Sequence, residues 1–311
     1  LKTPAPPKRT AAQQAAARQN LGIRQGKFPK TPVETLLKQA QSEDANTRFL
    51  AVLQLGKHEH ARKANVLANA LVQDANEKWL RAAVFNSLSK GESATVLEVM
   101  GTKTLRVNGD VRQDFRTALK DLGMVAAQDC TPDQLIHFWN LGMQHASAPF
   151  AKKHVQFTVW ERVAFLNGLI AGAKKKGGKL TATHPDAHPL RNLIPLKSKL
   201  TPEELKEKYE RRALPVDVVA DISIRSTLRS AKNSVWAGLS LPRRFTAMEL
   251  LGHTDFGFAG DTLLRLLTPR LELVDIGLRT PDIQSAAVQA LGNLNDVRVG
   301  QALLVPEAWE S

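Results

Sequence analysis

The sequence has very little cysteine and few aromatic residues. Its 311 residues include one cysteine, Cys130, and one tyrosine, and Phe, Trp and Tyr together make up 5%. A single thiol excludes an internal disulfide and any zinc site that needs two thiolates. A core with so few rings has to be built mostly from Leu, Ala and Val, and this composition favours helices.

Long apolar runs are also missing. The run from Val163 to Ala173 is too short and too interrupted for a helix that crosses a bilayer, so we expect no membrane-spanning segment. The first nine residues contain Lys and Pro and no apolar stretch like that of a signal peptide. Because the chain begins at Leu1 rather than Met, we expect it to have been processed or excised from something larger.

Acidic residues are outnumbered by basic ones. Lys and Arg number 43 and Asp and Glu number 30, which gives a formal net charge of +13. A surplus of this size attracts polyanions without regard to their sequence. Two interpretations stay open: a basic surface that faces a protein partner and, as the alternative, a surface that binds nucleic acid. A concave basic stripe would favour nucleic acid, whereas scattered charge would not.

One helical pattern recurs along the chain. In residues 284–292, QSAAVQALG, a polar residue is followed by small or apolar residues three, four, seven and eight positions later. The same pattern begins at Arg48, Arg81 and Arg244. These offsets place the apolar positions on one helix face, and the small last residue lets a neighbouring helix approach closely. The pattern predicts stacked helix pairs, in which we expect the three arginines to bond to neighbouring caps.

We therefore predict an all-α fold, a right-handed superhelix of HEAT-like helix pairs with an irregular insertion. Residues 1–30 form an N-terminal arm with a possible capping helix, and residues 179–215 form the insertion, which contains a charged helix at 201–213. Residues 31–178 and 216–311 form the repeats. The helices expected there cover residues 33–41, 44–56, 61–73, 74–91, 92–101, 111–126, 131–144, 159–178, 216–232, 242–252, 258–267, 281–292 and 296–304.

Several polar residues stand where these helices should begin. Thr31, Asp44, Thr131 and Thr201 can each accept a hydrogen bond from a free N–H of the first turn. Two DAN tripeptides, beginning at Asp44 and 30 residues later, are expected to mark equivalent turns. The last repeat ends near Trp309 without a capping repeat, so we expect more protein to follow.

Four blocks of the chain resemble one known family. They are DANEKWLRAAVFNSL (74–88), WERVAFLNGLIAGAKKKGGKL (160–180), RRFTAMELLGHTDFGFAGDTLLRLLTP (243–269) and DIQSAAVQALGNLNDVRVGQALL (282–304). In this order they are similar to the HEAT-repeat region of membrane-bound dehydrogenase-like c-type cytochrome proteins of planctomycetes and verrucomicrobia. In that family the region lies between a β-propeller and a c-type haem domain. The resemblance implies an exported, periplasmic location and a scaffold role beside an electron-transfer module.

The chain also departs from that family. The haem attachment motif Cys-x-x-Cys-His is absent, because Cys130 is followed by Thr131, Pro132 and Asp133. The propeller is absent as well. If the resemblance holds, the chain is the middle of a longer polypeptide, and no catalytic or haem residue carries over onto it. We expect it to bind no cofactor of its own and to have no enzymatic activity.

One basic segment is superficially similar to a phosphate-binding loop. In AKKKGGKL (173–180), however, Ala173 replaces the first Gly and Leu180 replaces the Ser or Thr that would hold magnesium. A solvated basic loop is the simpler interpretation, although such a loop could contact phosphates or an acidic partner. The residues that we select for contact with an anion or a partner are Lys152, Lys153, Lys174, Lys175, Lys176, Arg243 and Arg244.

Two histidine clusters are weak candidates for metal binding. His184, Asp186 and His188 alternate along a loop, but a fourth ligand is not evident. His58 and His60 follow a predicted helix end, where histidine complements the helix dipole. We therefore predict no metal site.

The tryptophans divide into two groups. Those expected in the core, because they fall within apolar helical patterns, are Trp79, Trp139 and Trp160; those that could be exposed anchors at an interface are Trp236 and Trp309. Taken together, the sequence predicts a non-catalytic scaffold that binds a protein partner or flanking domains of its own polypeptide, with nucleic-acid binding as the alternative.

Overall fold

The computed structural model describes residues 31–102, 106–107, 110–111, 113–143, 158–175, 198–211, 214–236, 240–267 and 281–304. Nearly all regular structure in these ranges is helical, which confirms the prediction of an all-α fold. The helices are α2 (Val33–Gln39), α3 (Ala45–Leu55), α4 (Lys63–Gln73), α5 (Lys78–Ser87), α6 (Glu92–Thr102), α7 (Gln113–Asp129), α8 (Pro132–Met143), α9 (Val159–Lys175), α10 (Pro202–Glu210), α11 (Val216–Ser234), α12 (Leu241–Leu251), α13 (Phe256–Arg265), α14 (Pro281–Leu294) and α15 (Val297–Leu303). None of these described helices is long and apolar enough to cross a membrane.

The connection between α6 and α7 contains the strands found in the described residues. These are β1 (Arg106–Val107) and β2 (Asp110–Val111), which pair in antiparallel fashion. The sequence predicted a break between helices here without predicting the strands. The expected arm and capping helix at 1–30, and most of the insertion, lie outside the described residues.

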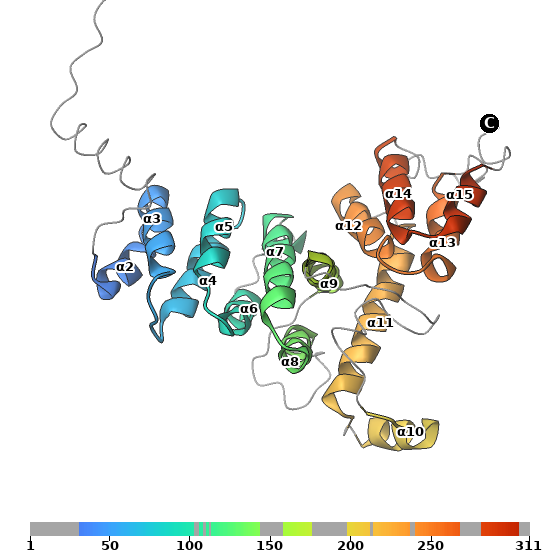
Figure 1. Cartoon of the computed structure of the whole chain (residues 1–311), viewed down its shortest axis with the longest axis horizontal. Coiled ribbons are helices and arrows are strands. Elements are labelled where there is room, and N and C mark those ends of the chain that lie inside the picture. Colours follow the sequence, from blue (N-terminus) through green and yellow to red (C-terminus); the bar gives the residue numbers. More distant parts are fainter. Residues whose placement is uncertain are drawn as a thin grey trace, which may run out of the picture.

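The helices lie in two rows along the long axis of the molecule (Figure 1). In one row, α3, α5, α7, α9, α12 and α14 each contact the next helix. In the other row, α4 contacts α6, α6 contacts α8, and α8 contacts α11. Helices consecutive in the chain pair across the rows, as α2 does with α3, α4 with α5, α6 with α7 and α11 with α12. Each helix pair therefore packs against the next one.

Close contact between α7 and α9 depends on glycine. Gly168 of α9 lies against the carbonyl oxygen of Lys120, and Gly172 lies against that of Met124, so that a Cβ on either glycine would overlap the α7 backbone. Both contacts advance by four residues, one turn, along their helices. The two helices are therefore parallel.

The small residue that ends the repeated pattern has the predicted role at two positions. A Cβ on Gly56, after α3, would lie 2.9 Å from the Ser87 Oγ of α5. A Cβ on Gly252, after α12, would lie 2.8 Å from the Ala290 carbonyl oxygen of α14. The prediction of close helix approach is confirmed there. At Gly292, the equivalent residue of α14, nothing lies within 4 Å of such a Cβ.

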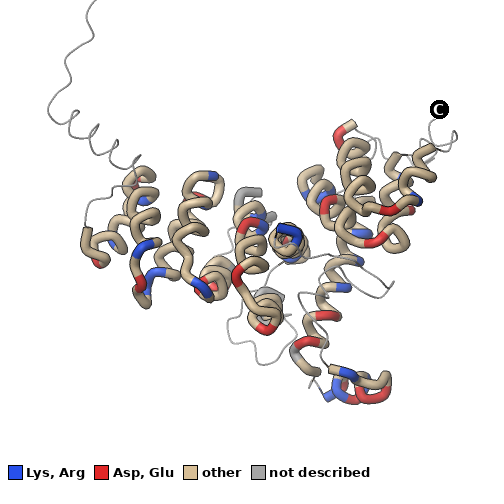
Figure 2. Tube along the Cα trace, in the orientation of Figure 1, with Lys and Arg blue, Asp and Glu red and all other residues tan. Residues whose placement is uncertain are grey.

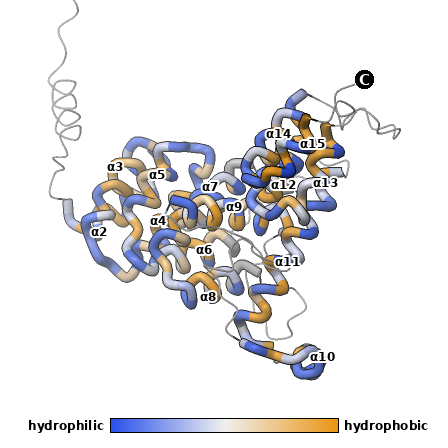
Figure 3. Tube along the Cα trace, turned by 45° about the vertical axis from the view of Figure 1, so that its right-hand side comes forward, coloured by the Kyte–Doolittle hydropathy of each residue, from blue (hydrophilic) through white to orange (hydrophobic). Residues whose placement is uncertain are grey.

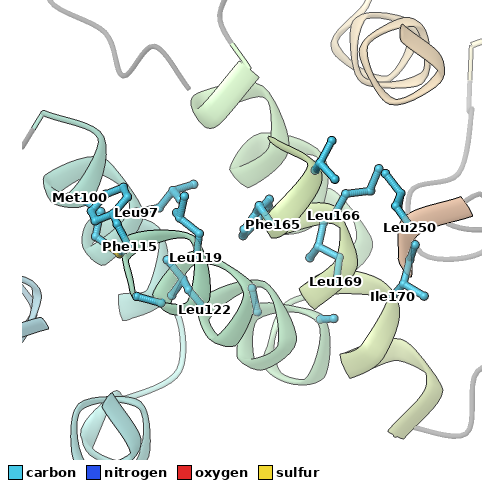
Figure 4. Packing of buried hydrophobic residues seen from close by; sticks show 14 of the residues in the cluster. Leu97, Met100, Phe115, Leu119, Leu122, Phe165, Leu166, Leu169, Ile170 and Leu250 are labelled. Carbon is cyan, nitrogen blue, oxygen red and sulfur yellow. The ribbon is translucent and has the colours of Figure 1, made fainter. Parts of the chain in front are cut away.

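The apolar faces of the helices form one continuous cluster of buried residues. Hydrophobic and hydrophilic segments alternate along most of the helices, as amphipathic helices require (Figure 3). Near the middle of the chain, Leu119 of α7, Phe165 and Ile170 of α9 and Leu250 of α12 belong to this cluster (Figure 4). Helix α10 contributes no buried residue, as its charged sequence predicted.

Two of the three pattern arginines reach helix caps, as expected. Arg48 is 3% exposed, and its Nε donates to the carboxylate of Asp74, the C-cap of α4, over 2.7 Å. Its Nη1 donates to the carbonyl oxygen of Glu43, just before its own helix, over 2.7 Å. Arg244 is equally buried, and its Nε donates to the carbonyl oxygen of Val235, the C-cap of α11, over 3.0 Å. These side chains bond one helix to the loop or helix beside it.

Arg81 makes a related pair of bonds. Its Nη1 donates to the carbonyl oxygen of Ala75, before its own helix, over 2.7 Å. Its Nε donates to the carboxylate of Asp121, within α7, over 3.0 Å. Arg81 thus ties two neighbouring helices of the row together without reaching a cap.

The two DAN tripeptides are not equivalent turns, contrary to the prediction. Asp44 caps α3, where its carboxylate accepts from the Thr47 N–H over 2.8 Å. Asp74 instead ends α4, and α5 begins only at Lys78 with Glu77 at its N-cap. The Asp74 carboxylate binds the Arg48 guanidinium, so it is not available to cap a helix.

Two of the three predicted threonine caps are present. Thr131 accepts from the Gln134 N–H over 3.3 Å, and Thr201 forms a full capping box with Glu204, so both predictions are confirmed. Thr31 does not cap α2, because the N-cap residue is Pro32 and no side chain bonds there. The prediction was wrong by one residue, since proline fits the start of a helix without a donor of its own.

Candidate functional site

The basic residues selected from the sequence do not form one site. Lys174 and Lys175 are exposed in the last turn of α9, where positive charge complements the helix dipole. Arg243 is partly buried near the start of α12. Lys152, Lys153 and Lys176 lie outside the described residues.

Arg244 was expected to contact an anion or a partner, and this prediction was wrong. The side chain is only 4% exposed and donates to the backbone carbonyl at the end of α11. The repeated pattern already contained the reason, because Arg244 is the counterpart of Arg48 and turns inward in the same way. Arg244 is a structural residue.

Arg243 and Lys174 lie at opposite ends of the contact between α9 and α12. The Arg243 guanidinium carbon lies 5.4 Å from the centre of the Trp160 ring, at the start of α9. Lys174 Nζ lies 2.9 Å from His253 Nδ1, just beyond the end of α12. A helix rises by about 1.5 Å per residue, so these two contacts are roughly 21 Å apart along α9. One small anion therefore cannot bind both basic groups.

Polar bonds also join the two helices at their middle. Asn167 Nδ2 donates to the Thr246 carbonyl oxygen over 3.0 Å and to the Glu249 carboxylate over 3.3 Å. Lys120 of α7 pairs with the same carboxylate. Trp160, Asn167 and Lys174 follow one another at seven-residue intervals, and their partners on α12 and just after it follow in the same order. Helices α9 and α12 are therefore parallel, joined by a polar seam.

His253 is the most strongly perturbed group of this seam. Burial lowers its pKa to about 4, and the charges of Lys174 and Lys120 act in the same direction. Near neutral pH the ring is therefore uncharged, and its Nδ1 can accept a hydrogen bond from the Lys174 ammonium. Lys174 is thus engaged within the protein, which leaves Lys175 as the freer cation at this end of α9.

The described part of the chain is not basic. Its residues include as many Lys and Arg as Asp and Glu, so the whole excess of 13 positive charges lies in residues outside the described ranges. The two signs are interspersed along the described helices, without a basic stripe on either row (Figure 2). The observation that would have favoured nucleic acid is therefore missing from these helices.

The tryptophans follow the prediction only in part. Trp139 is fully buried, and Trp160 packs partly buried against the core, as expected. Trp79 is 72% exposed, so its assignment to the core was wrong. Trp236, which could have been an exposed anchor, packs partly buried against the core. Trp309 lies outside the described residues.

The histidine clusters provide no metal site in the described residues, where no group of three candidate ligands lies together. His60 Nε2 instead lies 3.1 Å from the Glu34 carboxylate of α2, and its Nδ1 accepts from the Arg62 N–H. His60 thus has a structural role, although the expected role was to complement the dipole of the preceding helix. His184, Asp186 and His188 lie outside the described residues.

Sequence analysis missed a buried charged cluster where α7, α8 and α9 meet. Arg116 of α7 is 6% exposed, and Glu161 of α9 is fully buried. Glu161 forms a capping box with Thr158, and the spacing Thr158-x-x-Glu161 was a signal that could have been noticed. Arg116 could have been noticed because it falls between apolar positions of the core face, Phe115 and Leu119.

Comparison with known proteins adds no further constraint. The chain matches no family model, no curated protein and no solved structure.

Proposed function

We propose that this chain is a non-catalytic scaffold, a HEAT-like α-solenoid that mediates protein–protein or interdomain interactions. The observation that carries the proposal is the repeated packing of parallel helices. The last position of the repeated pattern contacts the next helix of the row at two places, Gly56 after α3 and Gly252 after α12. Buried arginines at the first position of that register bond the neighbouring elements. Regular stacking of this kind is typical of solenoids.

The mechanism of such a scaffold is geometric. The core is buried between successive helix pairs, and the outer faces remain available for contact. Trp79 of α5 and Tyr209 of α10 are 72% and 69% exposed. Tryptophan and tyrosine are enriched among residues that dominate binding energy at interfaces, so these two are candidate anchors for a protein partner.

The resemblance to the dehydrogenase-like cytochromes supports a more specific form of this proposal. In that form, the chain is an exported segment of a larger polypeptide and positions a propeller and a haem domain. The test is the intact mass of the native polypeptide from its source, combined with a haem stain. A haem-stained band much heavier than 34.2 kDa is expected. An unstained band at about that mass would contradict the cytochrome assignment and leave a free-standing scaffold.

Nucleic-acid binding remains the second candidate because of the net charge of +13. It is tested with a labelled DNA duplex, whose anisotropy is measured between about 50 and 200 mM salt. The scaffold proposal predicts weak binding, unchanged when Lys174 and Lys175 of α9 are both replaced by Gln. Saturable binding with a steep salt dependence would instead support the nucleic-acid function. If the double variant weakened that binding, the end of α9 would be part of the interface.

A further inference from the structure

Arg116 is a buried cation, and not all of its N–H groups have a hydrogen-bond acceptor among the described residues. Its side chain is 6% exposed, and its Nε and Nη1 find no hydrogen-bond acceptor in the described part of the chain. Trp139 of α8 is fully buried, and the same holds for its Nε1. Buried polar groups of folded proteins are nearly always paired, so unpaired donors suggest a bound water or ion that protein atoms do not replace.

The helix register places these donors around the start of α9. Gly168 lies against Lys120, so one turn earlier Arg116 lies beside Ala164, next to Glu161. Trp139 reaches the same turn of α9, because its ring stacks on Phe165 with the centroids 6.2 Å apart. Arg116 of α7 and Trp139 of α8 therefore both lie beside the first two turns of α9.

The described residues at this position carry charges of both signs. Arg116 and Arg162 are both partly or fully withdrawn from water, which lowers the pKa of each guanidinium. The carboxylate of Glu161 acts on both and opposes that shift. Among the described residues these are two cations and one anion, and an excess positive charge in a poorly solvated place is costly unless a counter-ion accompanies it.

We propose that Arg116, Trp139 and Arg162 form a binding site for a small oxyanion, a phosphate or carboxylate group, at the N-terminal end of α9. A guanidinium presents its N–H groups in a fork that matches the oxygens of such an anion. The indole N–H adds a neutral donor, and the first turn of a 17-residue helix adds a favourable dipole. The site is independent of the scaffold function and does not require a macromolecular partner.

The test is a titration of the whole chain with inorganic phosphate, with thermal unfolding as the readout and sodium chloride at equal ionic strength as the reference. A ligand that binds only the folded state raises the melting temperature in a saturable way. We expect phosphate to do so for the original protein and to have no effect on Arg116→Met. The matched control, Lys38→Met on the exposed side of α2, should respond like the original protein.

Without phosphate, Arg116→Met should melt at the same temperature as the original protein or above it, because an uncompensated charge has been removed. If Arg116 serves only to pair with Glu161, the variant should instead melt lower. Any phosphate effect should then be equal in both proteins, and this result would overturn the proposal. A complete lack of response to phosphate and to acetate would do the same, because bound water would then explain the unpaired donors.

A second variant keeps the test decisive if Arg116→Met does not fold. Trp139→Phe removes the indole N–H and keeps an aromatic ring against Phe165. Loss of one hydrogen bond should weaken phosphate binding about tenfold, as measured by calorimetry. An unchanged affinity of Trp139→Phe for phosphate would contradict the proposed site, of which Trp139 is a member. A parallel titration with acetate distinguishes the two ligand classes, because only a carboxylate site should respond to acetate more strongly than to phosphate.

Discussion

Gly168 of α9 rests directly on the carbonyl oxygen of Lys120 of α7, and no side chain fits between the two parallel helices. Glycine inside a helix costs about 1 kcal/mol relative to alanine, so its use here has to be offset by packing. The benefit is a short distance between the helix axes, which brings Leu119 and Phe165 into one core.

This contact predicts the effect of adding a single methyl group. Gly168→Ala should lower the free energy of unfolding by about 2 kcal/mol, because the overlap with α7 outweighs the better helix propensity. Gly292→Ala is the matched control, since nothing lies within 4 Å of its Cβ and it should stabilise by about 0.5–1 kcal/mol. Urea unfolding measures both. Equal effects with the same sign would show that α7 and α9 are not this close.

Arg48 should be important for stability because it bonds two elements from a buried position. Arg48→Met leaves the Asp74 carboxylate without its partner and should cost roughly 3 kcal/mol. The control is Arg62→Met, which breaks an exposed pair with Glu34 and should change stability much less, because water screens exposed ion pairs. Denaturant midpoints provide the comparison. A mild effect of Arg48→Met would contradict the role assigned to the pattern arginines.

His253 predicts a dependence of stability on pH. Its pKa is about 4 in the folded chain, against 6.5 for an unperturbed histidine. The unfolded chain therefore binds a proton as the pH falls below about 6.5, while the folded chain does not until about pH 4. The contribution of His253 to the free energy of unfolding is complete above about pH 6.5. It decreases as the pH falls from about 6.5 to 4, by at most about 3 kcal/mol.

The contribution of His253 to this pH dependence is measured by comparing the original protein with a variant that lacks the histidine. His253→Gln cannot titrate, so its loss of stability between about pH 6.5 and 4 should be smaller than that of the original protein. His58→Gln, at an exposed position, should keep the original pH dependence. Chemical unfolding at a series of pH values measures the slopes. Identical slopes for His253→Gln and the original protein would rule out a neutral, buried His253.

The two tryptophans Trp79 and Trp139 should respond oppositely to truncation. Trp139→Ala empties a fully buried position and should cost more than about 3 kcal/mol. Trp79→Ala removes an exposed ring and should change stability by no more than about 0.5 kcal/mol. If Trp79 anchors a partner, the same substitution should weaken the complex while thermal unfolding stays the same. A large loss of stability for Trp79→Ala would instead show that the Trp79 ring is buried in the core.

Local patterns of the sequence were sufficient for most helices and for several of their ends. The positions of Gly56 and Gly252 in the register predicted close approach because a repeated pattern implies repeated packing, although Gly292 at the equivalent position has no such neighbour in the described ranges. Thr131 and Thr201 were predictable because a cap bonds within its own first turn. The cap interactions are confined to a few consecutive residues, so the linear sequence contains both partners.

Predictions failed where the partner is distant in the sequence. Asp74 was expected to begin a helix, but the guanidinium of a residue 26 positions earlier holds it at the end of α4. Trp79 lies in the first turn of α5, where an apolar pattern does not say whether a neighbouring helix extends far enough to cover the ring. The basic cluster failed for the same reason, since adjacent Arg243 and Arg244 turn to different surroundings.

The parallel packing of α7 with α9 and of α9 with α12 has an electrostatic consequence. Each helix carries roughly half a positive charge at its N-terminus and half a negative charge at its C-terminus. In an antiparallel bundle these dipoles would cancel between neighbours, but here they point the same way. Along α7, α9 and α12, the N-terminal ends therefore make one edge more electropositive and the C-terminal ends make the other more electronegative, although the described side chains are balanced in charge. We expect a partner that approaches these three helices to meet a field to which the backbone contributes as well as the side chains.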